Sequence, residues 1–253
     1  MAIERITSRQ NPLLRHIKKL LSSKAYREET GSFVGEGGKL LREALMWNAE
    51  IETVVFSGES APAGVSENVR LVCVPSDVLA SISSMDAPQS ELFVCKIPQP
   101  PEGDLPQSFL VLDRLQDPGN VGTILRTADA FEVPVVLTDD CADLYNPKTI
   151  RATMGAIFRT PVIRMRRVAI IEACRAQNIP ISVTLLSEDT IDIRSAPLNG
   201  AVVIGSEGSG VSEAFLSAAS QHLMIPMSPR CESLNAAVAA SVVLWEMRRR
   251  KPE

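Results

Sequence analysis

The chain of 253 residues is 45% hydrophobic, 22% charged and 4% aromatic, which suits one large globular domain or two small ones and argues against general disorder. Its net charge of −4 by itself argues against a nucleic-acid partner, because proteins that bind nucleic acids usually carry basic surface. No apolar run reaches the ~20 residues of a membrane span, and no signal peptide is recognised, so we expect a cytoplasmic protein without a membrane partner.

The cysteines and histidines predict no metal site. Five cysteines are widely spaced and form no CxxC pair, and the two histidines add no metal-ligand spacing. We therefore expect reduced, mostly buried thiols.

The net charge is an average over regions of opposite sign. Residues 1–27 contain seven basic residues and one acidic residue, whereas residues 51–108 contain two basic and eight acidic residues. Residues 148–167 contain six basic residues and no acid, and residues 248–251 are all basic. Each basic segment alone is typical of a solvated helix face, but three of them make an anionic polymer a candidate partner.

The N-terminal part is predicted to be a small α/β unit. Amphipathic periodicity predicts helices at residues 11–24 and 37–47, and short apolar runs predict strands at 51–56, 69–74 and 91–97. Four prolines follow within residues 96–108, a composition that excludes a helix or a central strand. The predicted division is therefore a domain at 1–97, a linker at 98–108 and a second domain at 109–253.

The second domain alternates strands and helices, which predicts a mostly parallel sheet with helices on both faces. The expected strands are residues 109–115, 134–139, 160–165, 180–186, 201–207 and 222–227. The expected helices are residues 121–131, 147–157, 168–177, 211–219 and 233–250. Ligands of such sheets bind beyond the carboxyl ends of the strands, so the loops there are the candidate site.

Three of these loops carry distinctive residues. The first has an Asp-Pro-Gly turn at 117–119, then Asn120 as a candidate helix cap and Arg126 about two turns further on. An ordinary capped helix with a surface arginine is the simpler interpretation of that loop taken alone.

The second loop, residues 202–215, is glycine-rich and resembles a phosphate-binding loop in outline. It lacks the Lys-Ser/Thr pair of such loops, and Glu207 would repel a phosphate, so a neutral or cationic ligand fits better. The third loop, residues 225–235, has Ser233 as a candidate cap for a final helix rich in small residues.

Together, N-x-G-x-x-x-R after a strand, IGSEGSG, and IPM-x5-SLN resemble the three motifs of the SpoU/TrmH family of RNA ribose 2′-O-methyltransferases. The resemblance covers nearly the whole chain, and the N-terminal part looks like the ribosomal-protein-like RNA substrate-binding domain of many members. It implies a trefoil-knotted parallel sheet of the SPOUT superfamily, S-adenosylmethionine as cofactor, and a homodimer formed through the C-terminal domain.

Matching motif by motif, the resemblance implies that Asn120 and Arg126 are catalytic. The implied cofactor-binding residues are Thr184, Leu185, Gly205, Glu207, Gly208, Ile225, Met227, Ser233, Leu234 and Asn235. A guanidinium with a pKa above ~12 is a poor base, so we expect Arg126 to hold the phosphate beside the reacting ribose. Pro229 and Glu132 occupy positions where the family usually has glycine.

Structured RNA, with ribosomal RNA favoured, is the expected substrate, since its recognition is largely electrostatic. The candidate RNA-binding residues are Arg9, Asn11, Arg15, Lys18, Lys19, Arg27 and Arg151. Three alternatives remain open at this point: methylation of transfer RNA, a non-catalytic RNA-binding protein on the same fold, and a nucleotide- or dinucleotide-using enzyme.

Overall fold

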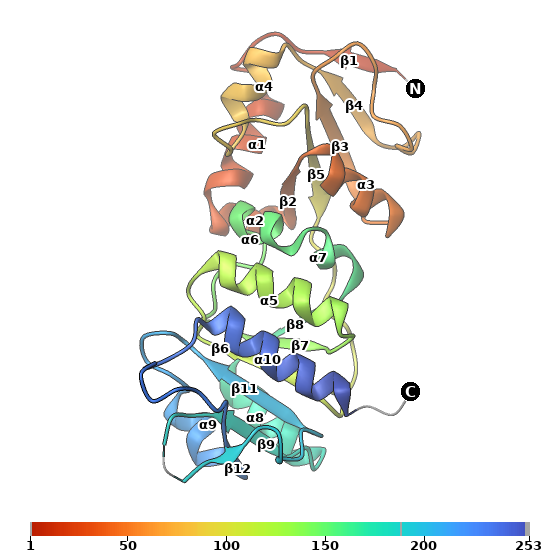
Figure 1. The fold of residues 1–253 in the computed structure, drawn as a ribbon. Coiled ribbons are helices and arrows are strands. Elements are labelled where there is room, and N and C mark those ends of the chain that lie inside the picture. The colour runs from red at the N-terminus through yellow and green to blue at the C-terminus, as the bar shows by residue number, and fades with distance from the viewer. Residues whose placement is uncertain (1, 188, 251–253) are drawn as a thin grey trace. The chain divides into compact units, whose positions relative to one another are not determined.

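The computed structural model describes residues 2–187 and 189–250, and the chain forms two compact units (Figure 1). Unit 1 contains residues 1–99 and 143–159, and unit 2 contains residues 100–142 and 160–253. Residues 143–159, which the sequence division puts with the C-terminal part, therefore pack with the N-terminal part.

Unit 1 is built on a five-stranded mixed sheet with the strand order β1-β4-β3-β5-β2. Its strands are β1 (Ile3–Arg5), β2 (Ser32–Glu36), β3 (Ile51–Phe56), β4 (Arg70–Cys73) and β5 (Glu91–Lys96). Its helices are α1 (Pro12–Ser22), α2 (Lys24–Thr30), α3 (Gly38–Met46), α4 (Ser76–Ile82), α6 (Pro147–Thr153) and α7 (Ala156–Arg159). β1 and β3 pair with β4 in parallel, whereas β5 runs antiparallel to β3 and β2.

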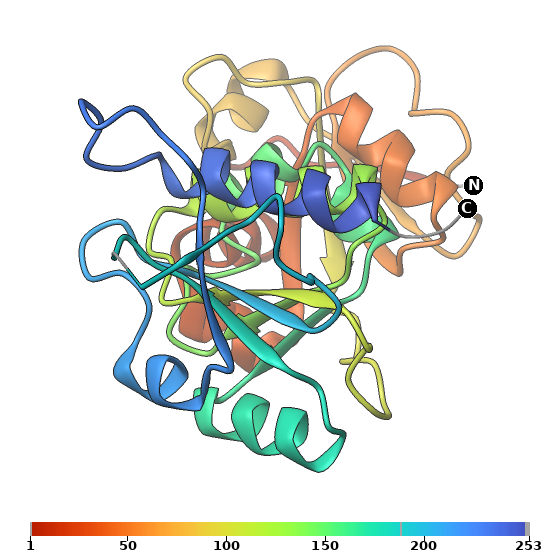
Figure 2. The same ribbon diagram turned by 60° about the horizontal axis from the view of Figure 1, so that its bottom comes forward.

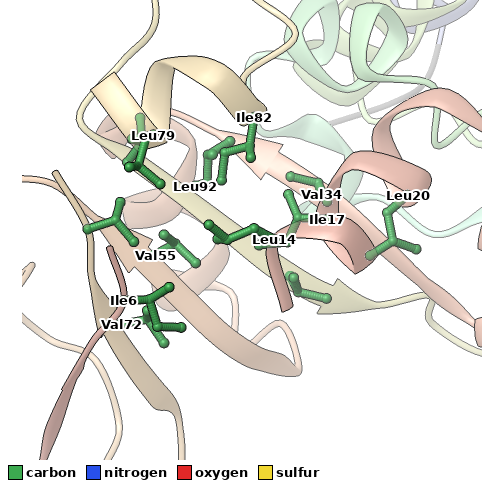
Figure 3. Close-up of a cluster of buried hydrophobic side chains, with 13 residues drawn as sticks. Ile6, Leu14, Ile17, Leu20, Val34, Val55, Val72, Leu79, Ile82 and Leu92 are labelled. Atoms are coloured by element: carbon green, nitrogen blue, oxygen red, sulfur yellow. The ribbon is translucent and has the colours of Figure 1, made fainter. Parts of the chain in front are cut away.

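Helix α1 begins where the Asn11 side chain accepts a hydrogen bond from the Leu13 amide at 2.9 Å, and Pro12 occupies the first turn. Its apolar stripe is fully buried and packs with α4 on the sheet (Figure 3). That core contains Ile6, Leu14, Ile17, Leu20, Val34, Val55, Val72, Leu79, Ile82 and Leu92. The predicted helix at 11–24 ends earlier than expected, because Ser23 is extended and caps α2.

Residues 143–159 join unit 1 through a buried ion pair and an aromatic cluster. The Arg27 guanidinium donates to Asp143 from Nε at 3.1 Å, and the two side chains are 4% and 12% exposed. Phe158 lies against the rings of Phe33 and Phe93, with centroids 6.2 Å away in both cases. Arg27 is therefore a structural residue, and its predicted contact with RNA is wrong because the side chain is buried.

Arg27→Ala should destabilise unit 1 by about 3–5 kcal/mol, because it leaves the Asp143 carboxylate buried without its counter-charge. Urea unfolding of the full chain measures this loss. Arg15→Ala, on the exposed side of α1, is the matched control and should change the free energy of unfolding by less than about 0.5 kcal/mol. Equal effects of the two substitutions would show that the buried pair does not stabilise the unit.

Unit 2 confirms the predicted parallel sheet: seven strands in the order β10-β12-β9-β11-β6-β7-β8 pair in parallel throughout. The strands are β6 (Phe109–Asp113), β7 (Val135–Thr138), β8 (Val162–Met165), β9 (Ile181–Thr184), β10 (Ile191–Asp192), β11 (Ala201–Gly205) and β12 (Gln221–Met224). The helices are α5 (Pro118–Ala130), α8 (Arg167–Ala176), α9 (Glu213–Ala218) and α10 (Ala236–Arg249).

Helices cover both faces of this sheet, as predicted. α5 and α10 lie side by side over one face, and α8 and α9 cover the other (Figure 2). Central strands β6 and β11 are almost entirely buried because apolar side chains of both faces are covered. The sheet thus brings the ends of β6, β9, β11 and β12 to a single edge.

Five short elements, β1, α2, β2, α4 and β10, are absent from the sequence prediction. β2 contains Gly35, and a methyl group there would lie only 2.2 Å from the Phe93 ring, so packing requires a residue of low strand propensity. The helix predicted at 147–157 is broken into α6 and α7, because Met154 and Gly155 both have positive φ.

Candidate active site

A cleft opens in unit 2 where the chain leaves β9, β11 and β12. Its volume is about 300 Å³. Eight of the residues predicted to bind a cofactor line it, namely Thr184, Leu185, Gly205, Glu207, Ile225, Met227, Ser233 and Leu234. The second and third loops, together with the end of β9, therefore converge on one cavity, as expected for the carboxyl edge of a parallel sheet.

Part of the cleft lining comes from a tight turn after β11. Ser206 and Gly210 exchange two backbone hydrogen bonds, of 3.1 and 2.9 Å, which fold the loop back on itself. A methyl group on Gly205 would lie 2.1–2.4 Å from the backbone of Gly210 and Val211. Gly208, at the exposed tip, is outside the cleft lining and has no atom within 4 Å of such a methyl group.

Three polar side chains, one from each motif, form a chain of hydrogen bonds at the cleft. Asn120 donates from Nδ2 to Glu207, and Asn235 donates from Nδ2 to the Asn120 Oδ1 at 3.2 Å. The structure thus links Asn120 and Asn235, which do not line the cleft, to Glu207, which does.

Two predicted helix caps are corrected. Asp117, not Asn120, caps α5: its carboxylate accepts from the Asn120 amide at 2.8 Å. Asn235, not Ser233, caps α10, and its Oδ1 accepts from the Ala237 amide at 2.9 Å. Because other residues cap the two helices, the Asn120 side chain can donate to Glu207, and Ser233 lines the cleft.

Arg126 lies two turns into α5 with its side chain exposed. Within residues 2–187 and 189–250, no hydrogen bond or ion pair engages its guanidinium. The planar fork is thus available to an external anion such as a phosphate.

Asp113, the last residue of β6, is a site residue that the sequence prediction missed. It is fully buried, accepts from the Ser212 amide at 2.7 Å and accepts from Arg167 Nε at 2.8 Å. Ser212 ends the glycine-rich loop and occupies the position just before α9, so the carboxylate anchors that loop to the neighbouring strand. An acidic residue in a continuous apolar strand was the available sequence signal.

Arg167 extends this anchor to Asp140, to which its Nη2 donates at 2.6 Å. Burial acts to raise the pKa of Asp140, but hydrogen bonds from Thr138 and Arg167 outweigh it and hold the pKa below the usual range. The carboxylate therefore stays charged, and the ion pair with Arg167 persists, throughout the neutral range.

The cleft suits a ligand with a flat apolar part and a positive charge. Its walls include Leu185, Ile204, Leu223 and Ile225, while Glu207 supplies a carboxylate at its polar side. Arg126, in contrast, is outside the cleft lining. The local chemistry therefore separates a cationic ligand in the cleft from an anionic one at the α5 surface.

The remaining candidate RNA-binding residues lie in unit 1. Arg15 and Lys18 are exposed, and Lys19 is exposed with its ammonium 5.3 Å from the Tyr26 ring centroid. Arg9 is paired with Asp77 at 2.6 Å, and Asn11 caps α1. Arg151 donates to the Ser84 hydroxyl at 2.8 Å and is one-third exposed.

The basic tail of the chain is partly structural. Arg250 donates to the carbonyls of Ile193 at 2.9 Å and Arg194 at 2.7 Å, while Arg248 and Arg249 contact Glu132 and Glu246. Lys251 lies outside the described residues. These contacts fix the last turn of α10 to its own unit rather than leaving three free cations.

Both departures from the family motifs fit the backbone found here. Glu132 has a φ of 53°, the left-handed conformation that glycine adopts readily, where α5 ends. Pro229 is the second residue of a turn closed by the Cys231 amide and the Ser228 carbonyl at 2.9 Å, a position that proline favours.

The five cysteines are unpaired; Cys95, Cys141 and Cys174 are buried, Cys73 is half-buried and Cys231 is exposed. Burial raises the pKa of Cys95 to about 12 and that of Cys174 to about 11. In the part of the chain that is described, no three potential metal ligands cluster, and no helix has the length and apolar character needed to cross a membrane.

Comparison with known proteins gives matches over both parts of the chain. The model of the SpoU rRNA Methylase family matches residues 107–245, and that of the MRM3-like substrate binding domain matches residues 11–92. The 23S rRNA (guanosine(2553)-2′-O)-methyltransferase RlmP of Bacillus subtilis is 30% identical, with 97% of this chain and 100% of the relative aligned.

Solved structures agree with these matches. The AdoMet-bound rRNA methyltransferase from Sinorhizobium meliloti has a TM-score of 0.86 at 30% identity, covering 99% of each chain. The SpoU methyltransferase AviRb from Streptomyces viridochromogenes, in complex with AdoMet, has a TM-score of 0.81 at 26% identity, covering 95% of this chain and 98% of that one.

Proposed function

The chain belongs to the SpoU rRNA methylase family, and we propose that it methylates a ribose 2′-hydroxyl of ribosomal RNA with S-adenosylmethionine as methyl donor. The observation that carries the proposal is the convergence of the second and third motif loops on one cleft, to which Asn120 of the first motif is joined by its hydrogen bonds with Glu207 and Asn235. A relative aligned over its full length, and named as a 2′-O-methyltransferase of 23S rRNA, supports the same reaction.

The cleft fits the cofactor by its chemistry. S-adenosylmethionine supplies a methyl group already activated by its positively charged sulfur. The apolar walls formed by Leu185, Ile225 and Leu234 suit the adenine ring, and Glu207 suits a cationic ligand. Thr184, Gly205, Met227 and Ser233 line the same cavity and complete the proposed binding site.

The chain's own residues then align the substrate. Arg126 binds the phosphate next to the reacting ribose through its planar fork, and its charge stabilises the negative charge that develops on the 2′-oxygen. Asn120 positions the ribose, and Glu207 with Asn235 fixes the orientation of its amide. A water or the bound phosphate accepts the hydroxyl proton, since the guanidinium is already protonated.

Four further features belong to the proposal. Residues 1–97 bind RNA, residues 98–108 form a linker, and residues 109–253 carry the transferase, although 143–159 of these pack within unit 1. The loops of the cleft form a trefoil knot. Two chains pair through the C-terminal domain, an arrangement supported by the exposed Trp245 of α10, whose side chain stacks edge-on against Phe131. A ribosomal substrate and a mostly buried set of free thiols favour the cytoplasm.

The test combines calorimetry of the purified full chain with S-adenosylmethionine and mapping of 2′-O-methyl groups in RNA from cells with and without the gene. We expect saturable cofactor binding and the loss of a 2′-O-methyl group from ribosomal RNA in the deletion. Loss of a methyl group from transfer RNA alone would contradict the assignment of ribosomal RNA as the substrate. Binding of RNA without cofactor binding would indicate a non-catalytic protein.

A further inference from the structure

A second cavity lies in unit 1, beyond the carboxyl ends of its three parallel strands. Because β1 and β3 both pair with β4 in parallel, the chain leaves all three strands at one edge of the sheet. The cavity has a volume of about 530 Å³, within the range of ligand pockets. It is lined by Arg5, Thr7, Ser57, Gly58, Cys73, Val74, Pro75 and Ser76. We call it the β4 pocket.

The lining of the β4 pocket is suited to a negatively charged ligand. Its described residues provide one guanidinium and three hydroxyl groups, and no acid is among them. Arg5 is exposed and has no carboxylate partner among the described residues. Two acids next in sequence to lining residues are paired elsewhere: Glu4, beside Arg5, accepts from Arg70 at 2.6 Å, and Asp77, beside Ser76, accepts from Arg9 at 2.6 Å.

We propose that the β4 pocket binds the phosphate and sugar of an unpaired nucleotide of the RNA substrate, a contact that rests on the proposed function. The Arg5 fork matches a phosphate, and the hydroxyls of Thr7, Ser57 and Ser76 can donate to or accept from the ribose. The pocket adjoins the basic segment 1–27, because Thr7 and Arg5 belong to both. The pocket therefore shares Arg5 with the segment of chain that also carries the exposed cations of α1.

Cys73 provides a reporter inside the pocket. Arg5 and Cys73 are register partners of neighbouring strands, so their side chains project from the same face of the sheet. The Cys73 thiol is half-buried and lies 3.8 Å from the Gly58 carbonyl, another lining residue. Cys95, Cys141 and Cys174 are buried, which leaves Cys231, in the third motif loop of unit 2, as the other accessible thiol.

In the test, the full chain is alkylated with N-ethylmaleimide, and the extent of alkylation of each cysteine is measured by peptide mass spectrometry. The probes are a 20-nucleotide oligouridylate, at a concentration where fluorescence anisotropy shows it bound, and uridine monophosphate with inorganic phosphate. We expect the oligouridylate to slow alkylation of Cys73 about tenfold or more while free phosphate and mononucleotide have little effect. Unchanged alkylation with the RNA bound would overturn the proposal, as would equal protection by the mononucleotide at the same concentration.

Arg5→Ala is the test variant and Arg42→Ala, exposed on α3 of the same unit, is its matched control. Arg5→Ala should reduce the protection of Cys73 to less than about twofold and lower the salt dependence of RNA binding by about one phosphate contact. Arg42→Ala should retain the protection, and equal behaviour of the two variants would refute the pocket. Affinity for S-adenosylmethionine is measured in parallel: its absence in the unchanged chain contradicts the proposed function, whereas its retention with no protection of Cys73 contradicts the pocket alone.

Discussion

Gly205→Ala should lower the affinity for S-adenosylmethionine by about tenfold to a hundredfold. The added methyl group would lie 2.1–2.4 Å from the backbone of Gly210 and Val211, so this part of the cleft lining must move. Overpacking against backbone costs about 1–3 kcal/mol, and each 1.4 kcal/mol corresponds to about tenfold in affinity. Calorimetric titration of the purified variant gives the dissociation constant directly.

Gly208→Ala is the matched control, because it makes the same chemical change three residues further along the same loop. A methyl group at Gly208 meets no atom within 4 Å, and its backbone does not require positive φ. Its cofactor affinity should stay within about twofold of the unchanged chain. If both variants bind the cofactor normally, the tight turn between Ser206 and Gly210 does not shape the cofactor site.

Arg126→Lys should reduce the rate of methyl transfer by about a hundredfold to a thousandfold while the affinity for S-adenosylmethionine stays unchanged. Lysine keeps the charge but cannot present two parallel donors to a phosphate, and the loss of one oxyanion-stabilising donor commonly costs this much. Single-turnover transfer to ribosomal RNA lacking the modification measures the rate, and calorimetry measures the cofactor affinity. Separation of the two readouts is expected because Arg126 does not line the cofactor cleft.

Arg126→Ala distinguishes geometry from charge. If the bidentate contact is what matters, the alanine and lysine variants should fall to similar rates. A lysine variant that retains most of the rate would contradict a bidentate role and leave only the charge. Reduced cofactor affinity in either variant would move Arg126 from substrate alignment to the cofactor site.

Much of the fold of unit 2 can be predicted from the local sequence pattern. Each of its apolar strands, and each helix between them, is encoded in a single stretch of chain. Contacts between distant residues are not encoded in this way. Arg27 appears in sequence as one cation of a basic segment, but Asp143, which neutralises it, is 116 residues away. β2 contains Gly35, a residue of low strand propensity, because the Phe93 ring of the neighbouring strand occupies the space that a side chain there would need. Both features depend on tertiary packing that no local window contains.

In the candidate site too, some features can be predicted from the sequence and others depend on tertiary contacts. The motifs identify which residues belong together, and eight of the ten predicted cofactor residues line one cleft. They do not reveal how the groups are held: Asp113 anchors the glycine-rich loop from a neighbouring strand, and the caps of α5 and α10 are Asp117 and Asn235 rather than the residues expected. Capping side chains within two or three residues of each other cannot be ranked without the backbone angles.

The return of residues 143–159 to unit 1 bears on how the chain is synthesised and how it can be recombined. Phe33 and Phe93 acquire their partner Phe158, and Arg27 its partner Asp143, only after part of unit 2 has been translated. Unit 1 thus cannot complete its packing as the first folding event on the ribosome. A graft that exchanged only the first 97 residues between relatives would also separate these partners, so residues 1–97 and 143–159 must diverge together.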